Sequence, residues 1–319
     1  MINRRSVVKA AGALAAAGAI PVPAAKAAPP LESGERYVDV PGGRVWVDVV
    51  GGGRRTPLVV LHGGPGAGHD YLEPLGDLAE DRAVVFYDQL GCGRSDHPDD
   101  PALWTIGRFV AELQAVRRAL RLDRCHLYGH SWGGWLAIEY LLRRPRGVKS
   151  VVLASTSAGA PEFVAGTKYL RSLLPPDVQQ TLDKYEAQGD FTAPEYLDAV
   201  NVFYANFLCR LSPYPAAIQR SFDILDGNQV YAAMNGPNEF VMTGNLASWD
   251  RTAEVRRITE PVLLTRGRYD EMAETCTVTL RKNLPHARTV EFPHSSHLAM
   301  WEDRAAYRRT VSSFLSTWD

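Results

Sequence analysis

The chain has 319 residues, of which 45% are hydrophobic and 22% charged, and its formal net charge is −1. This composition is that of an ordinary globular protein, long enough for one large domain or for a domain with an inserted lobe. The near-neutral charge gives no support for a nucleic acid or an anionic membrane as a partner. Because the sequence has neither Cys/His metal spacing nor a phosphate-binding loop, we expect no cofactor and no metal.

The N-terminus has the features of an export signal. A basic head precedes a weakly apolar Ala/Gly run over 10–20, and Ala25-Lys26-Ala27 forms a small-x-small cleavage site. The pattern predicts a signal peptide over 1–27, whose apolar run is too short to span a bilayer. The paired Arg4-Arg5 resembles a twin-arginine signal, which exports folded proteins. We therefore expect a mature protein that starts near Ala28, works outside the cytoplasm (extracellular or in the cell envelope) and has no membrane contact after cleavage.

The next part of the chain predicts a parallel sheet. Residues 36–40 and 44–50 alternate apolar and polar side chains around a Pro-Gly-Gly turn, which predicts a hairpin at a sheet edge. Continuous apolar runs predict strands that are buried on both faces. Because these strands alternate with helical patterns, we expect an α/β fold with a mostly parallel sheet and helices on both faces. The buried strands are expected at 57–61, 83–87 and 148–154 and at the short apolar run 127–128, and the helices at 105–120 and 136–143.

The pattern changes between residues 155 and 250, where helical stretches replace strand-like runs. The buried-strand pattern resumes at 261–265. This order predicts a helical cap over 155–250, inserted between core segments 28–154 and 251–319. The cap should cover the carboxyl edge of the sheet, where open α/β folds place their sites. Helices are expected at 169–174, 176–188, 194–208 and 216–225 in the cap and at 275–284 and 301–318 beyond it, with a last strand at 289–292.

Gly129-His130-Ser131-Trp132-Gly133 has the G-x-S-x-G pattern of a nucleophile elbow. It stands between a predicted strand and a predicted helix, as this sharp turn requires. The turn strains the backbone of the serine, and Gly129 and Gly133 provide the small neighbours that it needs. The pattern therefore predicts Ser131 as a catalytic nucleophile above a helix N-terminus, which favours developing negative charge.

A serine nucleophile needs a base, and the base needs an acid that orients it. In this arrangement the acid and then the histidine follow the serine, each after a late strand. Asp270 and His297 occupy these positions, with Glu271 as the alternative acid and His294 as the alternative base. We prefer Asp270 for its Gly-x-x-Asp spacing, and His297 because it lies further along its loop and can reach back to Ser131. The other histidines are expected in structural or solvent roles.

An oxyanion hole should be built from two backbone N–H groups. Trp132, the residue after the nucleophile, supplies the first. The second should come from the loop His62-Gly63-Gly64-Pro65-Gly66, in which Pro65 has no N–H. We expect Gly64 to be the second donor, with Gly63 as the alternative.

Several of these strings together resemble the proline iminopeptidase family of α/β-hydrolases. The resemblance rests on residues 62–66, 88–95 (Asp-Gln-Leu-Gly-Cys-Gly-Arg-Ser), 129–134 and 267–271 (Gly-Arg-Tyr-Asp-Glu). The cap motif 234–240 (Met-Asn-Gly-Pro-Asn-Glu-Phe) and the ending 296–303 look closest to the broad-specificity branch, the tricorn-interacting aminopeptidases and amino-acid amidases.

The resemblance implies an α/β-hydrolase fold with an inserted cap. It also implies that Glu239 and Glu271 bind the free α-ammonium of the substrate, so that only the first peptide bond reaches Ser131. Paired carboxylates that face a cation in a partly dry site form charge-assisted hydrogen bonds. The export signal departs from the usual cytoplasmic members and argues against a tricorn-like protease as partner.

The leading expectation is a secreted serine aminopeptidase that releases the N-terminal residue of short peptides through an acyl-enzyme. The near alternative keeps the mechanism and acts on amides or esters of free-amine amino acids, or on a natural-product precursor. A non-catalytic binding protein on the same fold is the alternative from another class. The preference for proline, the oligomeric state and the pairing of Cys92, Cys125, Cys209 and Cys276 are not fixed by the sequence.

Overall fold

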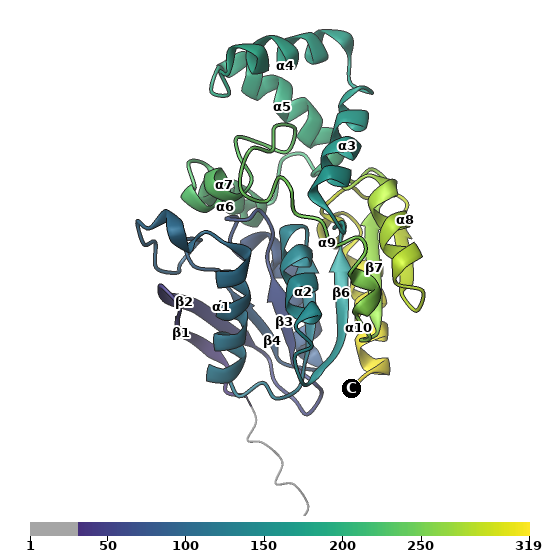
Figure 1. Cartoon of the computed structure of the whole chain (residues 1–319). Coiled ribbons are helices and arrows are strands. Elements are labelled where there is room, and N and C mark those ends of the chain that lie inside the picture. Colours follow the sequence, from purple (N-terminus) through teal and green to yellow (C-terminus); the bar gives the residue numbers. More distant parts are fainter. Residues whose placement is uncertain (1–30) are drawn as a thin grey trace, which may run out of the picture.

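The computed structural model describes residues 31–319, so the predicted signal peptide over 1–27 lies outside the described residues. These residues form an eight-stranded sheet with the strand order β1-β2-β4-β3-β5-β6-β7-β8 (Figure 1). The pairs β1–β2 and β2–β4 are antiparallel, and all other neighbouring strands are parallel. The predicted α/β class is thereby confirmed. The strands are β1 (Gly34–Val40), β2 (Gly43–Val50), β3 (Leu58–Leu61), β4 (Val84–Tyr87), β5 (Cys125–His130), β6 (Val148–Ala154), β7 (Val262–Gly267) and β8 (Arg288–Phe292).

Different helices cover the two faces of the sheet because successive side chains of a strand point to opposite faces. Val59 and Leu127 belong to the apolar core on the side of α1, α2 and α8, whereas Val60 and Tyr128 belong to the core on the side of η1, α9 and α10. These helices are α1 (Ile106–Ala119), α2 (Trp132–Leu142), α8 (Glu274–Asn283), α9 (Ala299–Glu302), α10 (Arg304–Thr317) and the 3-10 helix η1 (Asp70–Glu80); two further short 3-10 turns are η2 (Pro101–Leu103) and η3 (Val255–Arg257).

Five helices lie between β6 and β7 in the chain and beyond the carboxyl ends of the parallel strands in space (Figure 1). Two of them, α4 and α5, project furthest from the sheet and are held by an apolar core of their own, which includes Leu182, Tyr196 and Phe203. These helices therefore cover the carboxyl ends of the strands, where the predicted site lies. The helices are α3 (Ala160–Arg171), α4 (Pro176–Gln188), α5 (Pro194–Phe207), α6 (Ala216–Leu225) and α7 (Gln229–Met234).

Two predicted helices differ from the structure, and a third helix, α7, has no predicted counterpart. The helix expected at 169–174 is the end of α3, which begins at Ala160 and ends at Arg171. Gly166 weakens the helical pattern in the first part of α3; in the fold, a Cβ at Gly166 would lie 2.8 Å from the Ala273 methyl. Helix α7 has only six residues, too few for a helical period to be visible. The helix expected at 301–318 is interrupted at Asp303, whose φ of −135° and ψ of 51° are not helical.

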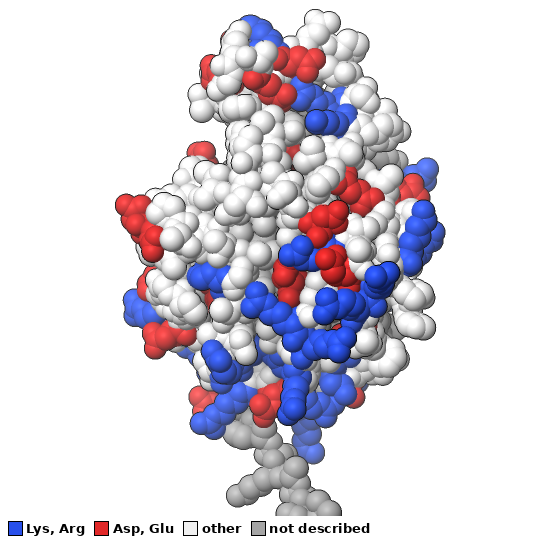
Figure 2. All heavy atoms as spheres, viewed as in Figure 1, with Lys and Arg blue, Asp and Glu red and all other residues white. Residues whose placement is uncertain are grey.

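The four cysteines are buried free thiols, so none of them forms a disulfide bond in the structure. Within residues 31–319, no helix is both long and apolar enough to cross a membrane. Lys and Arg gather at the end of the molecule opposite α4 and α5 (Figure 2). On the face shown there, the near-zero net charge therefore conceals an uneven distribution, with more basic side chains at the end opposite the cap than on it.

Candidate active site

Ser131 lies between β5 and α2 on a strained turn, with φ 55° and ψ −124°. Positive φ is costly for a residue with a side chain, and here the surrounding backbone maintains it. The Ser131 N–H donates to the Ala154 carbonyl at 3.0 Å, and the Ser131 carbonyl accepts from the Gly134 N–H at 2.8 Å. A Cβ at Gly133 would collide with the backbone of Leu61 on the neighbouring strand β3. The local sequence thus allows a turn that raises the serine at the carboxyl end of the sheet.

His297 follows β8 and is oriented by Asp270, which follows β7. The His297 Nδ1 lies 2.7 Å from Asp270 Oδ1, and both side chains are buried. The Met272 N–H donates to the same Asp270 oxygen at 2.9 Å. Burial raises the pKa of Asp270, but the neighbouring His297 and these hydrogen bonds outweigh it and hold the pKa below its ordinary value. Asp270 is therefore a carboxylate that fixes the imidazole through Nδ1 and leaves Nε2 for other partners.

The geometry separates Asp270 and His297 from their sequence alternatives. Glu271 approaches the other nitrogen of the imidazole, with Oε1 3.4 Å from His297 Nε2, so it does not occupy the orienting position. His294 is exposed, and its carbonyl accepts from Arg210 at the surface. Ser131, His297 and Glu271 line one pocket, whereas Asp270 lies behind His297.

The loop after β3 brings Gly63 and Gly64 against the nucleophile. A Cβ at Gly63 would lie 3.1 Å from the Ser131 Cβ, which shows how closely the two backbones approach. The Gly63 N–H donates to the Tyr71 hydroxyl at 2.7 Å, so it is already engaged. Gly64 lines the pocket together with Trp132 and has φ +104°, a conformation that favours glycine. Of the two candidates for the second oxyanion donor, the geometry favours Gly64.

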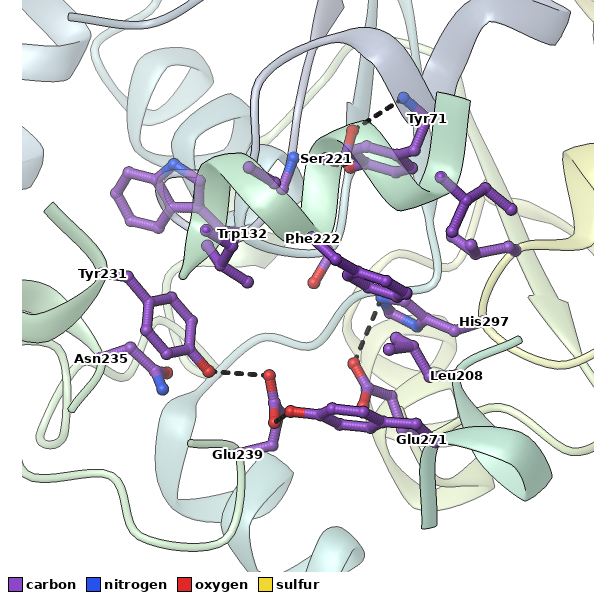
Figure 3. A pocket seen from close by; sticks show the side chains of 18 of the residues that line it. Tyr71, Trp132, Leu208, Ser221, Phe222, Tyr231, Asn235, Glu239, Glu271 and His297 are labelled. Carbon is purple, nitrogen blue, oxygen red and sulfur yellow. Dashed lines mark hydrogen bonds and ion pairs between the residues drawn. The ribbon is translucent and has the colours of Figure 1, made fainter. Parts of the chain in front are cut away.

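Glu239 lies on the cap side of the same pocket, and two tyrosines hold it. Its Oε2 accepts from the Tyr204 hydroxyl at 2.6 Å and its Oε1 from the Tyr231 hydroxyl at 2.7 Å (Figure 3). Burial, and then the adjacent Glu239, raise the pKa of both tyrosines well above its ordinary value, so both keep their protons. The two donors fix the carboxylate without neutralising its charge.

Glu271 is a buried carboxyl group with an unused acceptor. Its Oε2 has no hydrogen-bond partner among the described residues, although the side chain is buried. Burial and the nearby charges of Glu239 and Asp270 raise the pKa of Glu271 above its ordinary value. Burial lowers the pKa of His297, but Glu271 and Asp270 more than compensate, so that pKa is raised. This part of the pocket consequently favours a positive charge.

The pocket has a volume of about 900 Å³ and lies between the sheet and the cap. Its apolar lining includes Trp135, Phe163, Phe222 and Leu225. Among residues 31–319, no group of three or more His, Cys, Asp or Glu side chains is arranged to hold a metal ion. The predicted site residues that line the pocket are Gly64, Ser131, Trp132, Glu239, Glu271 and His297.

Comparison with known proteins agrees with this architecture. Residues 56–304 match the family model of the alpha/beta hydrolase fold. The chain is 41% identical to a proline iminopeptidase of Saccharolobus solfataricus over 82% of this chain and 86% of that protein, and 40% identical to one of Heyndrickxia coagulans over 89% and 99%. The chain belongs to the proline iminopeptidase family of α/β hydrolases.

A solved member of the proline iminopeptidase family superposes closely on this chain. The crystal structure of the proline iminopeptidase of Mycobacterium smegmatis has a TM-score of 0.82 at 35% identity, covering 89% of this chain and 98% of that one. Membership makes the protein a serine hydrolase, as the resemblance of its motifs implied. The tricorn-interacting branch is a finer assignment that these similarities leave open.

Sequence reasoning missed the partners of the Glu239 carboxylate in this member of the proline iminopeptidase family. The sequence does not distinguish a cap-core role from a pocket role for the aromatic residues Phe203, Tyr204, Phe207 and Tyr231. The structure places Phe203 in the cap core, whereas Tyr204 and Tyr231 line the pocket. The difference arises because α5 and α7 each direct a tyrosine hydroxyl to Glu239, an arrangement in three dimensions that no local sequence pattern marks.

Proposed function

We propose that this protein is a serine aminopeptidase that releases the N-terminal residue of short peptides through an acyl-enzyme. The observation that carries the proposal is the pair of carboxylates, Glu239 and Glu271, in the pocket that also holds Ser131 and His297. One of them has a buried oxygen without a partner among residues 31–319, which a substrate ammonium would satisfy. The names of the relatives, proline iminopeptidases, support the same activity.

The chemistry follows from the roles we propose for these groups. The Ser131 hydroxyl attacks the carbonyl carbon of the first peptide bond, and His297 Nε2 takes its proton. Asp270 keeps the imidazole oriented and stabilises its charged form. The N–H groups of Gly64 and Trp132 stabilise the oxyanion. His297 then protonates the leaving amine, and water hydrolyses the acyl-enzyme by the reverse sequence of proton transfers.

Glu239 and Glu271 account for the restriction to an unblocked N-terminus. They offer carboxylate oxygens on the cap side and on the His297 side of the pocket, so the ammonium is held between two elements at a fixed reach from the nucleophile. A blocked N-terminus has no positive charge to offset their burial. An internal peptide bond would place neutral backbone against both carboxylates, at a cost in desolvation.

A panel of aminoacyl-arylamides, each with a free and with an acetylated N-terminus, tests this proposal. We expect hydrolysis of the free-amine series, with the acetylated series poorer by orders of magnitude in kcat/KM, and labelling of Ser131 by a serine-directed phosphonate. Equal rates for the two series would exclude the aminopeptidase assignment but keep a serine hydrolase. Absence of phosphonate labelling in folded protein would favour a binding protein on the same fold.

The size of the pocket favours a second candidate, an amidase or esterase for amino-acid amides or esters. A volume of about 900 Å³ is near the upper end of the range of small-molecule pockets and exceeds the needs of one amino-acid residue. The apolar side chains of Phe222 and Leu225 line it. The leaving group could therefore be a bulky apolar amine or alcohol, such as part of a natural-product precursor, in place of a peptide. Comparing leaving groups at a fixed aminoacyl part separates the two candidates.

We also propose that the enzyme acts outside the cytoplasm and is related to the broad-specificity, tricorn-interacting branch. Export is supported by the basic head and cleavage pattern of residues 1–27, and the branch by the cap motif at 234–240. Fractionation of a producing cell, with N-terminal sequencing of the mature protein, tests export. A mature N-terminus at Met1 in the cytoplasmic fraction would contradict it. A broad profile across the arylamide panel, without a requirement for proline, is the result expected for that branch.

A further inference from the structure

Tyr71 and His130 form a buried connection between three parts of the candidate site. Tyr71 belongs to η1 and His130 is the residue directly before the nucleophile. The Tyr71 hydroxyl lies 2.7 Å from the Gly63 N and 3.0 Å from His130 Nδ1, and His130 Nε2 lies 3.0 Å from the His297 carbonyl oxygen. Tyr71 is 6% exposed and His130 1%, so water cannot readily replace either partner.

The direction of each hydrogen bond in this chain is determined by its ends. The Gly63 backbone N–H can only donate and the His297 carbonyl can only accept, so His130 carries its proton on Nε2. Burial, followed by the proximity of His297, lowers the pKa of His130 to about 3, so the ring is neutral and Nδ1 is an acceptor. The Tyr71 hydroxyl therefore accepts from Gly63 and donates to His130. Each hydrogen bond between the Gly63 N–H and the His297 carbonyl therefore has only one possible direction.

The neighbouring peptide of the loop is fixed in the same way. The Gln89 N–H donates to His62 Nε2 at 2.9 Å, so His62 Nδ1 carries the proton that the Gly63 carbonyl accepts at 3.0 Å. In a trans peptide the carbonyl and the N–H point in opposite directions. Holding the Gly63 carbonyl thus directs the Gly64 N–H, the proposed oxyanion donor, and Tyr71 holds the preceding peptide through the Gly63 N–H.

Tyr71 is itself anchored to the cap and to the core. Its N–H donates to the Ser221 hydroxyl of α6 at 3.0 Å (Figure 3), and its carbonyl accepts from Trp301 Nε1 of α9 at 2.7 Å. Tyr71 therefore lies where three parts of the molecule meet. These are the cap, the loop 62–66 that carries Gly64 (the oxyanion loop) and the loop that carries His297. Nothing in the chemistry proposed above uses its hydroxyl.

We propose that Tyr71, acting through His130, is a positioning residue that sets the oxyanion loop and His297 in register with Ser131. This inference rests on the proposed serine hydrolase mechanism, but not on the identity of the substrate. Removing the hydroxyl leaves the Gly63 N–H and His130 Nδ1 both unpaired in a buried place, and each unsatisfied group favours a shift of its backbone. Shifts of this kind lower kcat, because alignment matters most in the transition state.

The test compares Tyr71→Phe with Tyr128→Phe as a matched control. Tyr128 is an equally buried tyrosine on β5, and its hydroxyl bonds that of Tyr307 at 2.6 Å, away from the pocket. Both variants lose one buried hydroxyl, so both should lose thermal stability to a similar extent. For Tyr71→Phe we expect kcat to fall about 10- to 100-fold on a free-amine arylamide and on an amine-free aryl ester, with KM little changed, and phosphonate labelling to slow in parallel. Tyr128→Phe should keep the wild-type kcat.

Equal kcat values for the two variants, in a wild type that is active and labelled, would overturn the role of Tyr71 alone. A wild type that neither hydrolyses these substrates nor reacts with the phosphonate would overturn the proposed function, and this role with it. If Tyr71→Phe does not fold, His130→Gln and His130→Ala provide the same test. A glutamine retains one acceptor and one donor, so it should keep more of kcat than alanine; equal losses would count against the inference.

Discussion

Glu271 Oε1 lies 3.4 Å from His297 Nε2, the nitrogen proposed to accept the proton of Ser131. In its ionised form Glu271 stabilises the imidazolium, and together with Asp270 it outweighs burial and raises the pKa of His297. In the free enzyme the base is consequently held in its protonated, inactive form over a wider pH range than an ordinary histidine. A substrate ammonium that pairs with Glu271 offsets this charge, so binding of the proper substrate would also release the base.

The pH dependence of kcat/KM follows from that relationship. His297 must be neutral to act as a base, so activity is lost as pH falls through its raised pKa, and the acidic limb should lie above the ordinary histidine range. Glu271→Gln removes the charge and should move this limb about one pH unit lower on an amine-free ester. The measurement is a pH profile of kcat/KM for both proteins. An unmoved limb would contradict the coupling of Glu271 to His297.

Glu239→Gln should separate substrates with and without an amine. The variant keeps the shape of the side chain between Tyr204 and Tyr231 but loses its charge. We expect kcat/KM on a free-amine arylamide to fall about 100-fold, the worth of a desolvated charge-assisted pair of about 3 kcal/mol, with little change on an amine-free ester. Steady-state kinetics on the two substrates decide it. Equal losses on both would remove Glu239 from binding the amine.

The difference between what the sequence predicts and what the structure adds has a physical basis. Ser131, Asp270 and His297 can be predicted because each follows the end of a predicted strand, and parallel strands bring such ends to one edge of the sheet. Tyr204 and Tyr231 could not be assigned to Glu239 because they come from separate cap helices, whose mutual packing depends on contacts distant in sequence. Short sequence motifs therefore predict the catalytic residues of the core, whereas the contacts of the cap residues around Glu239 depend on the tertiary structure.

The same distinction explains the overlooked role of the segment that carries Tyr71. Its eleven residues form a 3-10 helix with Pro74 inside, so neither a helical nor a strand period marks it. His130 was expected in a structural or solvent role, and only its two ring contacts indicate what it connects. Hydrogen-bond networks of this kind join residues from different elements, so no regular spacing in the sequence indicates them.

Gly64→Ala should damage the proposed oxyanion hole. The residue has φ +104°, and a Cβ there would lie 2.5 Å from the Gly66 N, so the loop must move to accept a methyl group. Since loss of one oxyanion donor typically costs about 100-fold or more in turnover, we expect a fall in kcat of that order with KM little affected. Gly76→Ala is the control, because a Cβ at Gly76 meets nothing within 4 Å. A fully active Gly64→Ala would exclude Gly64 as the donor.

Activity should be insensitive to chelators. The proposed mechanism assigns proton transfer to His297 and oxyanion stabilisation to backbone N–H groups, and residues 31–319 contain no group of ligands arranged for a metal ion. Dialysis against EDTA should leave kcat and KM for an arylamide substrate unchanged. Loss of activity that returns on addition of a divalent metal would contradict the mechanism.

Asp319→Asn should reduce stability without touching the pocket. Arg82 is 1% exposed, and its guanidinium donates to both carboxylate oxygens of Asp319, at 2.9 and 3.2 Å. The substitution leaves a buried cation with a neutral partner, which should cost about 2 kcal/mol in the free energy of unfolding. Glu35→Gln, which breaks the exposed pair with Arg94, should lower the free energy of unfolding by much less, because solvent screens this pair. Urea unfolding of the wild type and the two variants measures both effects. Neither residue lines the pocket, so kcat of both variants should be that of the wild type. Similar losses of stability in the two variants would show that burial of Arg82 does not set the strength of its ion pair.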